Sequence, residues 1–176
     1  MSDLDSLARW SRHLRVATLA ALIALPVGAL AMLLSDAPGF TALAASLSVP
    51  PEALAPRLVP FVLAFAFAPT LVLLWVLDRM RQLFGAFAGG AVLTSQAARN
   101  IRQIGQGFLV LAILPLLTRP ALTVLLTAGA EPGQRVLALG VDSRMAAFAL
   151  LAGLLVVIGW AMGQAAEAAA ENRAFV

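Results

Sequence analysis

Side chains that could perform acid–base, nucleophilic or metal chemistry are few in this chain. The 176 residues include twelve arginines but no lysine, no cysteine and a single histidine, His13. Schiff-base enzymes, Walker A phosphate loops and protein kinases all require a lysine amine, so the chain belongs to none of these classes. Without cysteine it forms no disulfide, iron–sulfur cluster or thiolate zinc site. We therefore expect a protein that is not an enzyme and that binds neither a cofactor nor a metal.

The arginines are the remaining candidates for a functional site. An arginine deep in a bilayer is costly, so Arg119 is a candidate anion site or gating contact, and snorkelling to the interface is the alternative. Asp78 and the arginines beside it suggest either a binding site or a solvated helix end that faces anionic lipid. The next pair of arginines suits an acidic protein partner or anionic lipid equally well, and we expect no direct contact with nucleic acid. The candidate interaction residues are Arg79, Arg81, Arg99, Arg102 and Arg119.

The composition places the chain in a membrane. Hydrophobic residues make up 61% and charged residues 12%, and the mean hydropathy is +0.93. Soluble domains are about 45–50% apolar and about 25% charged, so a soluble monomer is excluded. A transmembrane helix needs about 20 apolar residues, and four segments qualify. We expect an all-α integral membrane protein, a four-helix bundle in one domain over 1–176, with spans near 16–34, 58–77, 101–118 and 145–164.

The third span is ambiguous because Arg119 stands near the middle of its apolar run. A helix that enters the bilayer near Arg102 rises about 1.5 Å per residue and reaches Arg119 about 25 Å later, near the opposite headgroups. Pro120 disfavours helical dihedrals in the residue before it, which favours an exit over Thr118–Arg119. The alternative is a continuous helix over 107–128 with Arg119 buried against a partner.

An early exit leaves an exported segment over 121–142. Its two β-favouring runs, Leu122–Thr127 and Arg135–Val141, flank a Glu-Pro-Gly turn and predict a small extracytoplasmic β-hairpin. Asp142 and Ser143 are then suited to cap the last helix. The other exported loop, over 35–57, is rich in proline, alanine and serine.

The arginines also predict the orientation. Four crossings put both termini on one side with a helical loop over 78–104, and the positive-inside rule makes that side cytoplasmic. Trp10, Trp75 and Trp160 fall near the same side, as interfacial aromatic residues do. We expect a multi-pass membrane protein with both termini in the cytoplasm, and a cleaved signal peptide ending near Ala31 is the alternative for the N-terminus. The arginines of this side are Arg9, Arg12, Arg15, Arg79, Arg81, Arg99, Arg102 and Arg173.

The cytoplasmic loop carries a resemblance. It extends the second span, breaks at Gly89-Gly90, and restarts as a helix that Thr94 or Ser95 can cap. The stretches 87–90, 93–94 and 97–105, together with the ending 171–176, resemble the bacterial family known as "domain of unknown function 2975". That resemblance implies a four-helix inner-membrane protein without an established activity. Leu93 stands where the family commonly has an aromatic residue, and the asparagine that often follows the threonine is not at the same place.

Small residues in the last span could bring helices close together. Gly159 and Gly163 form a small-xxx-small pair with Gly153 further back, a spacing that suits packing within the chain or a dimer. No span carries an acid that could couple ion transport, and no inverted repeat is evident. We therefore expect a non-catalytic protein that acts through association, as an accessory subunit or as the membrane partner of a cytoplasmic regulator. A homo-oligomeric pore or exporter is the alternative.

Overall fold

The computed structural model describes residues 2–34, 59–92, 94–127, 140 and 142–174. Four long helices make up this part of the chain: α1 (Ser2–Leu34), α3 (Val59–Ala88), α4 (Ser95–Leu126) and α5 (Ser143–Ala174). The described residues contain no strand. Each helix is long and apolar enough to cross a membrane. The expected all-helical class with four apolar helices is confirmed.

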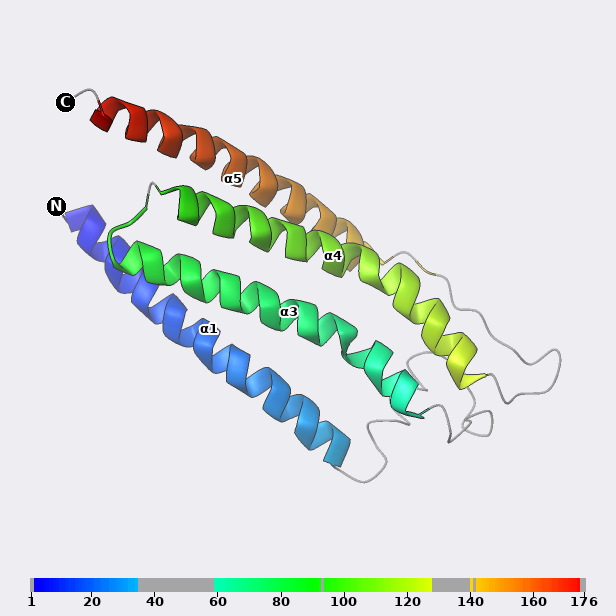
Figure 1. The fold of residues 1–176 in the computed structure, drawn as a ribbon. Coiled ribbons are helices and arrows are strands. Elements are labelled where there is room, and N and C mark those ends of the chain that lie inside the picture. The colour runs from blue at the N-terminus through cyan, green and yellow to red at the C-terminus, as the bar shows by residue number, and fades with distance from the viewer. Residues whose placement is uncertain (1, 35–58, 93, 128–139, 141, 175–176) are drawn as a thin grey trace.

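The turn between α3 and α4 lies where the sequence predicts a break. Gly90 has φ +78°, a left-handed conformation that a side chain disfavours. Thr94 caps α4, since its Oγ1 accepts a hydrogen bond from the amide of Ala97 at 3.2 Å. Figure 1 shows that the start of α1 and the end of α5 lie at the same end of the molecule as this turn. The predicted helical hairpin over 78–104 is therefore the continuous extension of two long helices.

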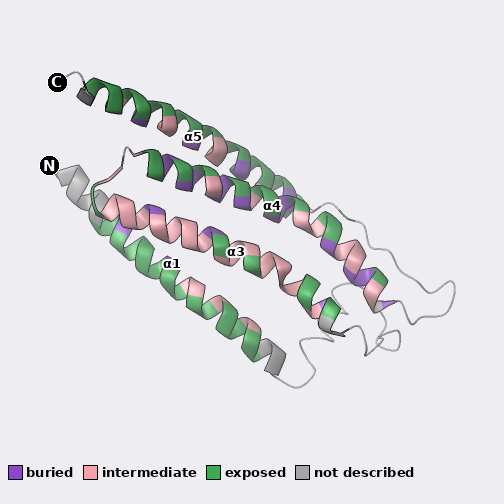
Figure 2. Cartoon of the chain, in the orientation of Figure 1, coloured by how far each residue is buried: buried purple, intermediate pink, exposed green. Residues whose placement is uncertain are grey.

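The helices form an open layer and not the compact bundle that we expected. Among the described residues, α1 packs on α3, α3 on α4 and α4 on α5, and these consecutive pairs make the main contacts (Figure 1). The two outer helices, α1 and α5, each have one principal neighbour. A closed bundle would require contacts between the first and last helices as well. Many large hydrophobic side chains on all four helices are therefore exposed, and Figure 2 shows exposed residues along each helix.

Glycines on two sides of α4 let its neighbours approach closely. A Cβ atom on Gly105 would lie 2.9 Å from Val156 and 3.0 Å from the carbonyl oxygen of Ala152, both on α5. A Cβ atom on Gly107 would overlap Val76 of α3. Two residues turn a helix by about 200°, so these two glycines serve opposite neighbours. This pairing lets α4 lie close to both α3 and α5.

The third helix corrects two of our expectations. It does not end over Thr118–Arg119 but continues to Leu126, so the predicted strand Leu122–Thr127 is wrong. The second predicted strand lies almost wholly outside the described residues, and of its positions Gly140 is irregular. The helix tolerates Pro115 and Pro120 in its interior. A proline favours a helix end locally, but the packing of a long apolar helix overrides that preference.

Threonines accompany these two prolines. The hydroxyl of Thr118 donates to the carbonyl oxygen of Leu114 at 3.1 Å, and that of Thr123 donates to the carbonyl oxygen of Arg119 at 3.1 Å. Both threonines are buried. Hydrogen bonds of this kind satisfy a hydroxyl inside an apolar helix and often bend it. They allow α4 to carry polar residues where it passes its prolines.

Candidate functional site

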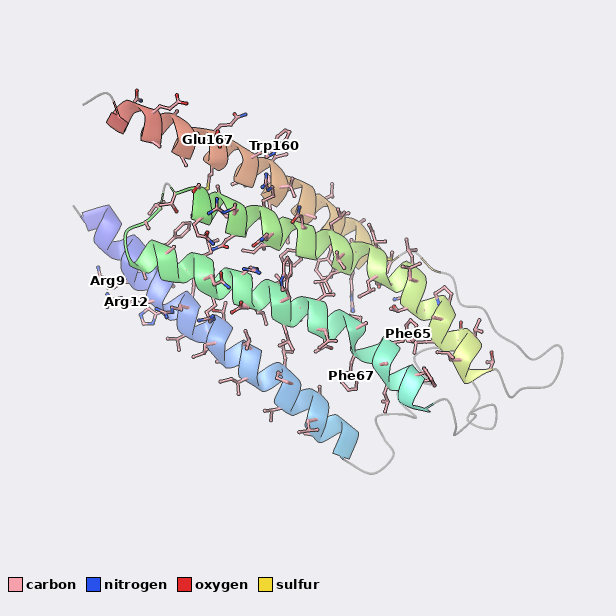
Figure 3. The ribbon with its side chains drawn as sticks, in the orientation of Figure 1. Arg9, Arg12, Phe65, Phe67, Trp160 and Glu167 are labelled. Atoms are coloured by element: carbon pink, nitrogen blue, oxygen red, sulfur yellow. The ribbon has the colours of Figure 1, made fainter. Side chains whose placement is uncertain are left out.

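A groove between α4 and α5 brings the two sets of candidate residues together. It has a volume of about 310 Å³ and lies on the half of the layer near the α3–α4 turn. Arg99 and Arg102 line it from α4, and Gly159, Trp160 and Gly163 line it from α5. Figure 3 shows Trp160 and Glu167 on the C-terminal half of α5. We call this feature the α4–α5 groove; its remaining lining residues are Ser95, Ala98, Gln164 and Glu167.

The floor of the groove is formed by close helix packing. A Cβ atom on Gly159 would lie 2.9 Å from the amide nitrogen of Arg102 and 3.0 Å from the carbonyl oxygen of Ala98. A Cβ atom on Gly163 would lie 3.9 Å from the Cβ atom of Ala98, which is an ordinary contact. Gly153 has no atom within 4 Å of its Cβ position. The glycine pair therefore serves packing within the chain, and Gly153 takes no part in it.

The two arginines of the groove have spare hydrogen-bonding capacity. Arg99 donates from Nη2 to the side-chain oxygen of Gln96 at 2.8 Å. The side chain of Arg102 forms no hydrogen bond with another described residue, and neither arginine forms an ion pair with a described carboxylate. A guanidinium carries five N–H donors, so most of the donors in the groove are available to a ligand.

The arginines of α3 are engaged with their own helix. Arg81 forms an ion pair with Asp78, with 2.7 Å between Nη2 and Oδ1, and its Nε donates to the same oxygen at 3.1 Å. Gln82 donates to the other oxygen of Asp78 at 2.7 Å. Both carboxylate oxygens are thereby occupied, and the charge of Arg81 is neutralised locally. The expected helix end at this point is wrong, because α3 continues ten residues beyond Asp78 to Ala88. The cluster lies within the helix and leaves little for an external ligand.

Arg79 is held by an aromatic ring. Its guanidinium lies 5.4 Å from the ring centroid of Trp75, a cation–π distance, and its Nη1 donates to Gln82 at 3.3 Å. Its Nε is buried and has no hydrogen-bond partner among the described residues. Trp75 in turn packs against Gly107 of α4, where a Cβ atom would lie 3.1 Å from the indole. Arg79 is therefore part of the α3–α4 contact.

Arg119 lies at the other end of the layer, beside the start of α5. Its Nη2 lies 3.7 Å from Oδ2 of Asp142, and its side chain is 41% exposed. Asp142 also caps α5, because its Oδ1 accepts a hydrogen bond from the amide of Arg144 at 3.1 Å. That hydrogen bond lowers the pKa of Asp142 below its ordinary value, and the nearby arginines add to the effect. The continuous helix that we considered is thus observed, but Arg119 pairs with an acid of its own chain and is not fully buried.

The groove can hold an anion, and the described residues contain no cluster of three or more His, Cys, Asp or Glu side chains that could hold a metal ion. Two guanidinium groups and the N-terminal end of α4 supply positive potential, while Glu167 places one carboxylate in the lining. Sequence reasoning identified the arginines and glycines separately and did not assign Gln164 or Glu167. The spacing of Trp160, Gly163, Gln164 and Glu167 already puts them on one helix face. The pairing of that face with α4 required the tertiary structure.

Part of the stretch 97–105, one of those that carry the family resemblance, lies in the packed centre of the layer. Ala97, Ala98, Asn100, Ile101 and Ile104 of that stretch are all buried. Their pattern is accounted for by contacts of α4 with its neighbours. No protein-family model, curated protein or solved structure matches the chain.

Proposed function

We propose that this chain is a non-catalytic, multi-pass protein of the bacterial inner membrane that acts by associating with another protein. It serves as an accessory subunit of a larger complex or as the membrane partner of a cytoplasmic regulator. In this proposal both termini and the α3–α4 turn are cytoplasmic, because the positive-inside rule places arginine-rich segments there. The arginines of this end include Arg9, Arg12, Arg99 and Arg102.

The open layer is the observation that carries this proposal. In the most apolar stretch of α1 only 6% of the residues are buried, against 22% in α4. Lipid can cover apolar side chains, but helices in a membrane also associate through van der Waals packing and close approach of their backbones. An edge helix with one principal neighbour leaves such a surface unused within the chain. We therefore place the association on the exposed face of α1.

Purification in a mild detergent, followed by identification of the proteins that remain bound, tests the association. We expect a stoichiometric partner protein that is lost in Gly28→Leu, because Gly28 lies on α1 with no atom within 4 Å of its Cβ position. Gly153→Leu is the matched control, since that glycine on α5 is equally open. A solitary homo-oligomer that moves solute across liposomes would replace this proposal with a pore or exporter.

Cysteine labelling tests the proposed orientation directly, because the chain has no cysteine of its own. A membrane-impermeant thiol reagent applied to intact spheroplasts should modify a cysteine introduced at Gly133 and should not reach one introduced at Gly89. Labelling of both positions after permeabilisation shows that each cysteine is reactive. The reverse pattern in intact spheroplasts would invert the orientation.

A further inference from the structure

We propose that the α4–α5 groove binds the phosphate headgroup of an anionic phospholipid, with Arg99 and Arg102 as the phosphate ligands. The site rests on the proposed membrane location but does not depend on the proposed association with a protein partner. The groove of about 310 Å³ provides space for a headgroup between two helices. Basic pockets between transmembrane helices on the cytoplasmic side are a recurrent form of lipid recognition.

The hydrogen-bond donors of the groove suit a phosphate group. Arg99 and Arg102 are three residues apart on α4, so their side chains lie on neighbouring positions of one helix face. Guanidinium groups bind phosphate oxygens through paired N–H donors. Arg81 and Arg119 each have a carboxylate within 4.0 Å, whereas Arg99 and Arg102 have none among the described residues. Arg79 also lacks such a carboxylate but lies against the ring of Trp75. The groove therefore holds the two candidate arginines that have neither an ion-pair partner nor a ring partner among the described residues.

The apolar surface beside the groove favours a lipid over a soluble phosphate as the ligand. Trp160 lines the groove and is 67% exposed, as suits an indole at the level of the headgroups. Along α5, Val157 lies three residues before Trp160 and is exposed, and Leu150 continues that face. Along α4, Leu109 lies seven residues after Arg102 and is also exposed. An acyl chain would run along this apolar surface while its phosphate occupies the groove.

The carboxylate of Glu167 opposes the binding of an anion. It lines the groove one helical turn beyond Gly163 and gives the site a net charge of about +1 when both arginines are counted. This carboxylate also allows a test of the site, because removing its negative charge should strengthen the binding of phosphate. A general attraction of lipid to the basic end of the protein would not single out Glu167 in this way.

Native mass spectrometry of the detergent-purified protein, titrated with phosphatidylglycerol, measures the binding of individual lipid molecules. Neutralising one cation near a lipid surface costs about fivefold in affinity, so R99Q/R102Q should bind phosphatidylglycerol about 25-fold more weakly. R9Q/R12Q is the matched control, because these exposed arginines lie on α1 at the opposite edge of the layer (Figure 3). This control should change the affinity by less than about twofold.

Two further variants distinguish binding in the groove from a general effect of net charge. Gly163→Leu keeps every charge, and its Cβ atom fits beside Ala98 at 3.9 Å, but the longer side chain fills part of the groove and should weaken binding. Glu167→Gln should tighten it. Retained helicity by circular dichroism shows that each variant is folded.

The binding measurements can either support or overturn the lipid site. Stronger binding of phosphatidylglycerol than of phosphatidylcholine, lost in R99Q/R102Q but kept in R9Q/R12Q, supports the site. Equal losses in both double variants would reduce the effect to surface electrostatics and overturn it. Binding of inorganic phosphate as tight as that of phosphatidylglycerol would show an anion site that does not recognise lipid and would overturn the proposal. Loss of the protein partner in the association experiment would leave all of these results unchanged.

Discussion

Replacing Gly159 with alanine tests the contact that joins α4 to α5. The new methyl group would lie 2.9 Å from the amide nitrogen of Arg102 and 3.0 Å from the carbonyl oxygen of Ala98. Both atoms belong to the backbone and cannot be moved by a change of side-chain rotamer. The two helices must therefore separate by several tenths of an ångström or tilt apart. Gly153→Ala is the control, because the same substitution on the same helix meets no atom within 4 Å.

The expected magnitude follows from two opposing effects. Alanine favours an α-helix over glycine by about 1 kcal/mol, and this gain applies to both variants. Inserting a methyl group into a close-packed contact costs about 1–3 kcal/mol, and only Gly159→Ala incurs this cost. Gly153→Ala should therefore stabilise the protein by up to about 1 kcal/mol. The free energies of unfolding of the two variants should differ by about 1–3 kcal/mol.

Reversible unfolding in mixed detergent micelles, followed by circular dichroism, measures this difference. Tryptophan fluorescence gives a second signal, to which Trp160 contributes because its indole lines the groove that the substitution would open. Equal stabilities of Gly159→Ala and Gly153→Ala would refute the reasoning. That result would mean that α4 and α5 do not approach each other at Gly159 as closely as the structure describes.

Three other local contacts can be tested by substitution. The double variant Ala98→Cys/Gly163→Cys should form an intramolecular disulfide on mild oxidation, seen as a shift in gel mobility, because the Cβ positions are 3.9 Å apart and disulfides need about 3.5–4.5 Å. Gly90→Ala should lower the free energy of unfolding by about 1–2 kcal/mol, because residue 90 has a positive φ. Gly89→Ala is the control, since its Cβ atom would make only ordinary contacts and should cost no stability. Equal losses of stability in the two variants would contradict this prediction. The lowered pKa of Asp142 means that its carboxylate stabilises the folded state above the ordinary value of 3.8 and that this contribution is lost as the pH falls through the lower folded pKa. The stability difference between the wild type and Asp142→Asn should accordingly be constant from pH 8 to 5 and shrink below pH 3.8; a change near neutral pH would contradict the assignment.

The amino-acid sequence alone determined the number of apolar helices and several of their boundaries. Long uncharged segments and the two adjacent glycines of the α3–α4 turn are local signals, and so are the caps at Thr94 and Asp142. Each depends on residues within a few positions of one another. Reading such signals requires no knowledge of which helices are neighbours.

The extent of α4 beyond Arg119 was decided by the tertiary structure. Pro120 and the β-favouring run after it predicted a helix end and a strand, and both expectations were wrong because α4 continues to Leu126. Local preference for a strand amounts to tenths of a kcal/mol per residue, whereas every broken backbone hydrogen bond is costly in an apolar setting. The ion pair between Arg119 of α4 and Asp142, the residue before α5, connects positions 23 residues apart in the sequence. No local sequence pattern predicts it.

The tertiary structure also decided which glycines of α5 contact α4. Gly153, Gly159 and Gly163 look alike in the sequence, yet only the last two face α4, and Gly159 meets its backbone. Which side of a uniformly apolar helix turns toward a neighbour is not encoded by a polar face, because lipid and protein interiors are equally apolar. That choice is made by the shape of the partner, and here Ala98 and Gly105 leave the space that α5 occupies.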